Sequence, residues 1–145
     1  MEKRYALGLD FGSLSCRAVV ADVRDGREAG SASFAYPHAV MDRALPNGTP
    51  LPHGAALQHP QDYLDALAHV VPAALAASGV AASQLAGIGV DFTSCTMLPV
   101  TEDGTPLCFL PAFASDPHAY VKMWKHHSAQ PQTDRINALA AARGE

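Results

Sequence analysis

The 145-residue chain has little basic charge and no long uninterrupted apolar segment. Its Lys and Arg total 10 against 14 Asp and Glu, a formal net charge of −4, and they form no block of the kind that nucleic-acid-binding surfaces carry. The longest stretch rich in Ala, Val and Leu, residues 63–77, is interrupted by Asp65, His69 and Pro72. A membrane span needs about 18 uninterrupted apolar residues. We therefore expect neither nucleic acid nor a membrane as a partner.

Cysteine is also scarce. Cys16, Cys95 and Cys108 are odd in number and form no C-x-x-C pair, and no apolar leader precedes the first strand-like segment. Disulfide frameworks and common zinc motifs need more cysteines at closer spacings. We expect reduced thiols in a cytoplasmic protein.

What the chain does contain is enough apolar sequence, 48% of its residues, for the core of one ordinary domain. Residues 4–10, 16–23 and 29–35 have the composition of β-strands. Short connections, the second with the Asp25-Gly26 signature of a tight hairpin, predict an antiparallel meander. Residues 36–59 carry several prolines and no periodicity, which predicts an irregular excursion, interpreted as a solvated surface insertion.

Helical spacing of apolar residues then predicts a helix from Pro60 to a left-handed cap at Gly79, kinked at Pro72. A fourth strand follows within residues 86–98, and a second helix over residues 118–129 is expected after the Asp116-Pro117 start signal. A last helical piece begins at residue 133. Strands followed by strand–helix alternation predict an α/β fold with a mixed sheet.

Chemistry-bearing residues cluster first where strand 4–10 ends. Gly12 permits close backbone approach, Ser13 and Ser15 can donate hydrogen bonds, and Arg17 adds a permanent positive charge, as a phosphate site requires. Asp10 would repel bare phosphate, so its presence predicts Mg²⁺ bridging to nucleotide oxygens. The alternative is plain hairpin-turn chemistry. The Asp-Phe-Gly triplet here lacks the His-Arg-Asp loop of protein kinases.

A second loop follows the Ile-Gly-Val run of the fourth strand. Asp91, Thr93, Ser94 and Thr96 place one carboxylate and three hydroxyls within six residues, which suits a polyhydroxy ligand. Threonine is also ordinary in strands, and that is the alternative. Cys95 has no local base partner, so we expect an inert, buried thiol rather than a nucleophile.

A third cluster lies in the helix expected over residues 118–129. Helical spacing would place Tyr120, Trp124 and His127 on one face and Lys122 on another, so that an aromatic flanked by cations could form one wall of a sugar pocket. Alternatively Trp124 is a core anchor and the lysines are solvated.

These clusters resemble the FGGY carbohydrate kinase family, most closely the N-terminal part of its L-ribulokinase branch. The resemblance is carried by residues 9–19, 87–96 and 117–127. It implies a ribonuclease-H-like sheet of the actin and hexokinase type, with ATP and Mg²⁺ as cofactors. It further implies transfer of the ATP γ-phosphate to the terminal hydroxyl of L-ribulose in arabinose catabolism.

The resemblance also implies roles for individual residues. Asp10 would be the residue that holds Mg²⁺, and it is also one of the cofactor-binding residues. Ser13 stands where many relatives carry Thr, Leu14 where a hydroxyl is frequent, and Tyr120 where the ribulokinase branch tends to have Trp. The residues that would line the phosphate path are Gly12, Ser13, Ser15 and Arg17, and those that would face the sugar are Asp91, Thr93, Ser94, Lys122 and Trp124.

Members of this family are several times longer than 145 residues. Their second domain holds the adenosine, and their catalytic aspartate lies beyond position 145. We therefore expect residues 1–145 to be a partial N-terminal, sugar-binding kinase domain, without a catalytic residue of its own and inactive alone. The alternatives are another FGGY-type pentulose or polyol kinase, a non-catalytic nucleotide- or sugar-binding module, or a chain that pairs with another through an exposed sheet edge. A homo-oligomer is compatible with each of them.

Overall fold

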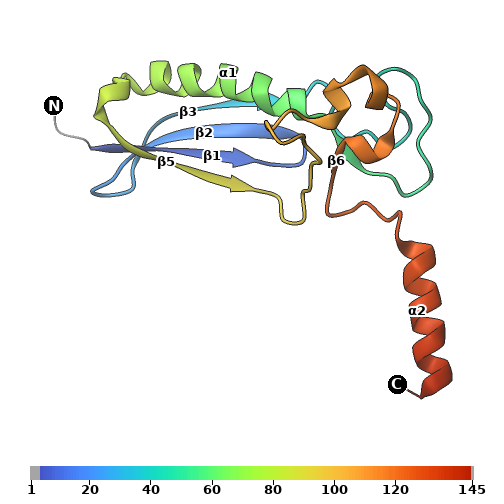
Figure 1. Cartoon of the computed structure of the whole chain (residues 1–145). Coiled ribbons are helices and arrows are strands. Elements are labelled where there is room, and N and C mark those ends of the chain that lie inside the picture. The colour runs from blue at the N-terminus through green and yellow to red at the C-terminus, as the bar shows by residue number, and fades with distance from the viewer. Residues whose placement is uncertain (1–3, 145) are drawn as a thin grey trace.

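Residues 4–144 are described by a computed structural model in which a long helix covers one face of a four-stranded sheet (Figure 1). The strand order is β3-β2-β1-β5. β1 (Tyr5–Phe11), β2 (Ser15–Asp22) and β3 (Glu28–Ala35) form the expected antiparallel meander. β5 (Leu85–Phe92) lies parallel to β1, because the chain crosses over through α1 before it pairs again. The predicted α/β fold with a mixed sheet is thus confirmed.

Alternation along β1 and β2 decides which face of the sheet is the core. Leu7 and Leu9 of β1 and Cys16, Ala18 and Val20 of β2 are buried beneath the helix, while the residues between them face outward. The turns are as predicted: the Gly12 N–H donates to the Ser15 carbonyl at 2.9 Å, and Gly26 adopts a left-handed φ of 73°.

The helix α1 (Pro60–Ser78) forms where capping and apolar spacing agree. His59 is the N-cap and its Nδ1 accepts the Gln61 N–H, Pro60 begins the helix, and Gly79 ends it with φ 66°. Ala66, Val70 and Ala74, four residues apart, form the buried stripe against the sheet. The predicted start and end of this helix are confirmed, and Pro72 lies within it.

The excursion after β3 is irregular, as expected, but its interpretation as a solvated insertion was wrong. Met41, Leu45 and Leu57 are buried in a second apolar cluster with Cys108 and Tyr120. The cluster forms because residues 41–58 and 107–121 supply apolar side chains that neither segment could bury alone. Two short strands join these segments, β4 (Leu57–Gln58) and β6 (Val121–Lys122), which pair antiparallel.

The helix predicted over residues 118–129 was also wrong. Asp116 does act as an N-cap, because its side chain accepts the His118 N–H. The helix that it caps is only the short 3-10 helix η4 (Pro117–Ala119), and the chain then extends into β6. Tyr120, Val121 and Met123 are all buried, so packing and pairing with β4 outweigh the local helical signal. The proposed common face of Tyr120, Trp124 and His127 therefore does not exist.

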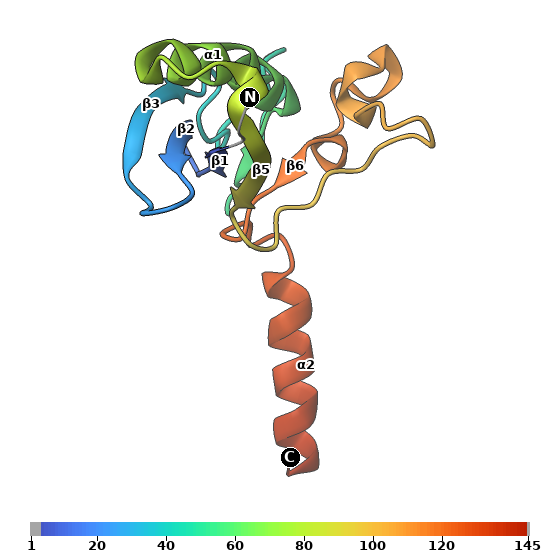
Figure 2. The ribbon, with the colours of Figure 1, turned by 90° about the vertical axis from the view of Figure 1, so that its left-hand side faces the viewer.

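The last helix, α2 (Gln130–Arg143), includes in its first turn Pro131, the residue that was expected to stop a helix. It projects away from the sheet in both views, and none of its residues is buried (Figures 1 and 2). No helix within residues 4–144 is long and apolar enough to cross a bilayer. The remaining short 3-10 helices are η1 (Ala82–Gln84), η2 (Leu107–Phe109) and η3 (Pro111–Phe113).

Candidate functional site

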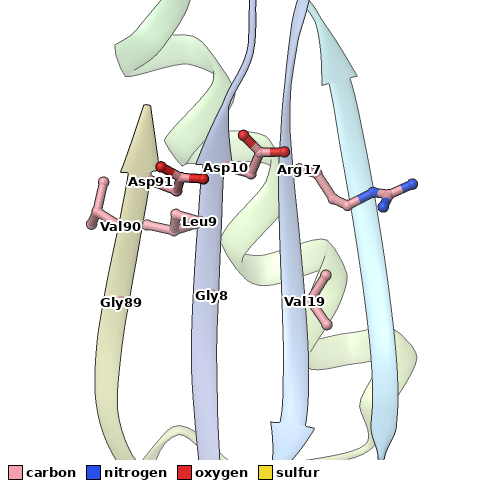
Figure 3. Close-up of a pocket in the computed structure, with 8 residues that line it drawn as sticks. All are labelled: Gly8, Leu9, Asp10, Arg17, Val19, Gly89, Val90 and Asp91. Atoms are coloured by element: carbon pink, nitrogen blue, oxygen red, sulfur yellow. The ribbon is translucent and has the colours of Figure 1, made fainter. Parts of the chain in front are cut away.

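Three charged residues lie on adjacent strands at the face of the sheet opposite α1. Asp10 on β1 is the register partner of Arg17 on β2 and of Asp91 on β5. Figure 3 looks onto this face, where the Asp10 and Asp91 carboxylates lie on neighbouring strands and the Arg17 side chain extends away from Asp10. All three residues are exposed. Within the described part of the chain, neither carboxylate forms an ion pair.

These residues line a hollow of about 460 Å³ on the outer face. Part of its floor is bare backbone, because the register partners Gly8 and Gly89 carry no side chain. A methyl group at Gly89 would meet no atom within 4 Å, so the space above the strand is open. The structure thus places Asp91 beside Asp10, the residue predicted to hold Mg²⁺, rather than with the hydroxyls of its own loop.

The turn after β1 carries the remaining predicted phosphate contacts. Ser15 lies two residues before Arg17 on β2, so alternation places both on the outer face with Asp10. Gly12 is closely packed: a Cβ there would lie 3.3 Å from the Ser15 carbonyl oxygen. Ser13 is half-buried at the tip of the turn. The structure therefore gathers Asp10, Gly12, Ser13, Ser15 and Arg17 at one end of the sheet.

The second loop starts beside this turn, because the Thr93 N–H donates to the Phe11 carbonyl at 3.3 Å. Two of its hydroxyls bond to each other: Thr93 Oγ1 and Thr96 Oγ1 lie 2.7 Å apart. Ser94 is exposed. Cys95 has a φ of 58°, which a residue with a Cβ rarely adopts, and it is exposed, so the prediction of a buried thiol was wrong.

A second hollow, of about 290 Å³, opens behind this loop. Thr93 and Thr96 supply its polar atoms, and the rest of its wall is apolar or aromatic. The lining residues are Phe11, Tyr63, Phe92, Thr93, Thr96, Leu98 and Val121.

Lys122 comes close to the second loop through backbone pairing. The backbones of Lys122 and Met97 exchange two hydrogen bonds, at 3.0 and 3.3 Å, so β6 lies beside the end of the second loop. The Lys122 ammonium donates to the His118 carbonyl at 3.1 Å. Trp124 follows two residues later, outside any helix, with 61% of its surface exposed. The alternative prediction, that Trp124 is a buried core residue, is therefore wrong.

One cluster of metal-ligating residue types lies elsewhere, at the start of α1. His38, His59 and Asp62 bring potential ligand atoms within 4.8 Å of one another. The two imidazoles, however, are stacked with centroids 4.4 Å apart and planes 22° apart, so their in-plane nitrogens cannot converge on one ion. His38 Nδ1 instead bonds to the buried Asp62 carboxylate at 2.6 Å, and burial lowers the pKa of His59. This cluster holds the excursion against α1.

Gln58 and Tyr63, which support the turn at residues 12–14 (the phosphate turn, after its predicted ligand) from the interior of the protein, were not anticipated. Gln58, 1% exposed, donates from Nε2 to the Ser13 carbonyl at 2.9 Å, and Tyr63 donates its hydroxyl to Gln58 Oε1 at 2.7 Å. Burial raises the pKa of Tyr63 to about 12, so its hydroxyl stays protonated and can donate. No motif marks either residue. The one signal in the sequence is a glutamine directly after the apolar segment 55–57.

The fold is that of sugar kinases. A xyloylose (xylulose) kinase from Brucella ovis superposes with a TM-score of 0.69 and 20% identity, over 97% of this chain and 25% of that one. A gluconate kinase from Lactobacillus acidophilus gives 0.67 and 16%, over 97% and 23%. No protein-family model matches the chain.

The sequence relationship is much closer and more specific. The chain is 56% identical to a ribulokinase from Mycolicibacterium smegmatis over 98% of its own length and 26% of the relative's. It is 49% identical to a ribulokinase from Halalkalibacterium halodurans, over 100% and 26%. The chain is thus a homologue of the N-terminal quarter of the ribulokinases. It spans about a quarter of the length of these relatives.

Proposed function

We propose that this chain forms the N-terminal, sugar-binding part of an ATP-dependent kinase that phosphorylates the terminal hydroxyl of L-ribulose. The observation that carries the proposal is the 56% identity to a ribulokinase over 98% of the chain. The solved xylulose and gluconate kinases, at 20% identity or less, support only the fold.

In this proposal the outer face of the sheet receives the nucleotide phosphates. Asp10 would hold Mg²⁺, and the donor set suits this ion because carboxylate oxygens are ligands that it prefers. Asp10 is exposed beside the open hollow and has no ion-pair partner in residues 4–144. When bound, Mg²⁺ neutralises charge on the transferred phosphoryl group. Gly12, Ser13, Ser15 and Arg17 would then orient the phosphate oxygens.

The sugar would lie beyond the second loop. Ser94 is exposed there, the Thr93 hydroxyl is held by Thr96, and β6 brings Lys122 alongside. Trp124 would supply an apolar wall for the carbon face of the sugar, and Asp91 would accept from a hydroxyl near the phosphate side. A cytoplasmic setting belongs to the same proposal, and the free state of Cys16, Cys95 and Cys108 supports it.

The proposal is tested in a chimera in which the 145 residues replace the matched quarter of the Mycolicibacterium smegmatis relative. We expect ADP release that depends on L-ribulose. Asp10→Asn should lower kcat/KM by about 100-fold or more, because a lost metal-positioning carboxylate removes several kcal/mol of transition-state stabilisation. Asp42→Asn, at an exposed carboxylate outside both hollows, is the matched control and should leave kcat/KM unchanged. A chimera without ribulose-dependent turnover would refute the proposal.

The sugar assignment has its own test in the same chimera. Trp124→Ala should raise the KM for L-ribulose about tenfold while the KM for ATP changes less than about twofold, because the indole would contact only the sugar. Phe113→Ala removes another exposed aromatic, outside both hollows, and serves as control. Equal changes in both KM values would show general destabilisation instead.

A further inference from the structure

The most completely buried polar side chain beside the phosphate turn is that of Gln58. It is 1% exposed, lies in β4, and contacts the turn from the interior. Its Nε2 lies 2.9 Å from the Ser13 carbonyl and 3.4 Å from the Gly12 carbonyl, and its Oε1 accepts the Tyr63 hydroxyl at 2.7 Å. Carbonyl oxygens only accept hydrogen bonds, so the amide nitrogen must face the turn.

The direction of these carbonyls determines where the turn presents its donors. In a planar trans peptide the C=O and the following N–H point in opposite directions. Because Gln58 draws the Gly12 and Ser13 carbonyls inward, the N–H groups of Ser13 and Leu14 point outward. Within residues 4–144 neither N–H donates to another group. Two successive N–H groups that point to the same side are a common arrangement for binding anions.

Gln58 also links the turn to the second loop. β4 pairs with β6, where Gln58 is opposite Val121, and Lys122 of β6 pairs in turn with Met97 at the end of the second loop. One buried amide and two short backbone pairings therefore join the two candidate ligand loops. In-line phosphoryl transfer depends on the distance between its two substrates, so this connection bears directly on turnover.

We propose that Gln58 is a positioning residue that orients the turn at residues 12–14 for phosphate and keeps it at a fixed distance from the loop at residues 93–96. The inference rests on the proposed kinase function for its catalytic consequence. Gln58 itself touches neither substrate. It acts through the Gly12 and Ser13 peptides.

The first test measures anion binding in the 145-residue chain and requires no catalysis. Inorganic tripolyphosphate is titrated while the backbone amide resonances of Ser13 and Leu14 are followed by NMR. Both should shift in the unsubstituted chain, and Gln58→Met, which keeps the side-chain volume but has no donor, should weaken binding about tenfold. The control, Gln84→Met, removes a glutamine that accepts the Ala81 N–H far from the turn and should bind normally. Unchanged binding by Gln58→Met, or no shift at Ser13 and Leu14 in the unsubstituted chain, would overturn the inference.

The second test uses the ribulokinase chimera. Gln58→Met should raise the KM for ATP about tenfold and lower kcat, with little change in the KM for L-ribulose. If Gln58 had a purely structural role, the substitution would lower the melting temperature and leave both KM values unchanged.

In the variant Gln58→Glu, the KM for ATP should fall as the pH is lowered from about 8 to 6. A protonated carboxyl can again donate to the turn, whereas the carboxylate repels the carbonyls of the turn. A pH-independent KM in this variant would contradict the proposed geometry. Loss of ribulose turnover in the unsubstituted chimera, with tripolyphosphate binding intact, would refute the kinase function and leave the anion-binding turn standing.

Discussion

Gly30 of β3 lies directly against the end of α1. A Cβ added there would lie 2.5 Å from the Ser78 nitrogen and 2.8 Å from the Ala77 carbonyl carbon. Both are backbone atoms of the last helical turn, so no side chain can rotate to make room. Since non-bonded carbon atoms need about 3.5 Å, the helix end would have to move by about 1 Å.

The expected loss of stability in Gly30→Ala follows from two opposing effects. Overpacking of a dense interior costs about 1–3 kcal/mol, while replacing glycine restricts the unfolded chain and returns about 0.4–1 kcal/mol. Displacement would also strain the helix cap, in which Ser78 Oγ accepts the Val80 N–H at 3.1 Å. We expect a net decrease in the free energy of unfolding of about 1–2 kcal/mol.

Urea denaturation of the 145-residue chain followed by circular dichroism measures this change. The control is Gly87→Ala in β5, where an added Cβ meets nothing within 4 Å and a small gain, about 0.4–1 kcal/mol, is expected. The two variants should therefore differ by about 1.5–3 kcal/mol. If both had the same midpoint and slope, the close approach of α1 to β3 would be refuted.

Two further predictions concern stability. Burial lowers the pKa of His126 and of His59, so these two side chains bind fewer protons in the folded protein than in the unfolded chain. The free energy of unfolding should therefore fall as the pH is lowered from about 7.5 to 5.5. His126→Gln should make this decrease smaller. A free energy of unfolding that does not change with pH in the unsubstituted chain would contradict the prediction. Leu7 is 1% exposed, so Leu7→Ala should lower the free energy of unfolding by about 2–5 kcal/mol. Leu14 is 58% exposed, so Leu14→Ala should change it by less than about 0.5 kcal/mol. Similar urea midpoints for the two variants would refute the placement of Leu7 in the core.

The sequence predicted the sheet and its covering helix because their signals are local. Strand alternation, the Asp25-Gly26 turn and the Pro60 and Gly79 caps each act within a few residues, and the structure agrees with all of them. The clustering of Asp10 and Arg17 also follows from a short hairpin, in which register is set by the turn.

Predictions failed where the partner lies far along the chain. The segment 118–129 has a good helix start, yet Val121 pairs with Gln58, 63 positions earlier, and the helix does not form. Residues 36–59 were predicted to be solvated because they are rich in proline and lack periodicity, and only packing against residues 107–121 buries their apolar side chains. Cys95 was expected to be an inert, buried thiol because the local sequence offers no base partner, but its left-handed backbone conformation leaves it exposed.

By itself, the sequence determined the strands of the main sheet, the first helix, the side-chain types in both loops and the relationship to sugar kinases, because propensity, capping and side-chain type are properties of neighbouring residues. Tertiary structure alone decided that Asp91 stands beside Asp10, that Lys122 pairs with the end of the second loop, and that Gln58 bonds to the turn at residues 12–14. Each of these depends on strand pairing between distant segments, and register between such segments is set by the burial of the whole core rather than by any local pattern.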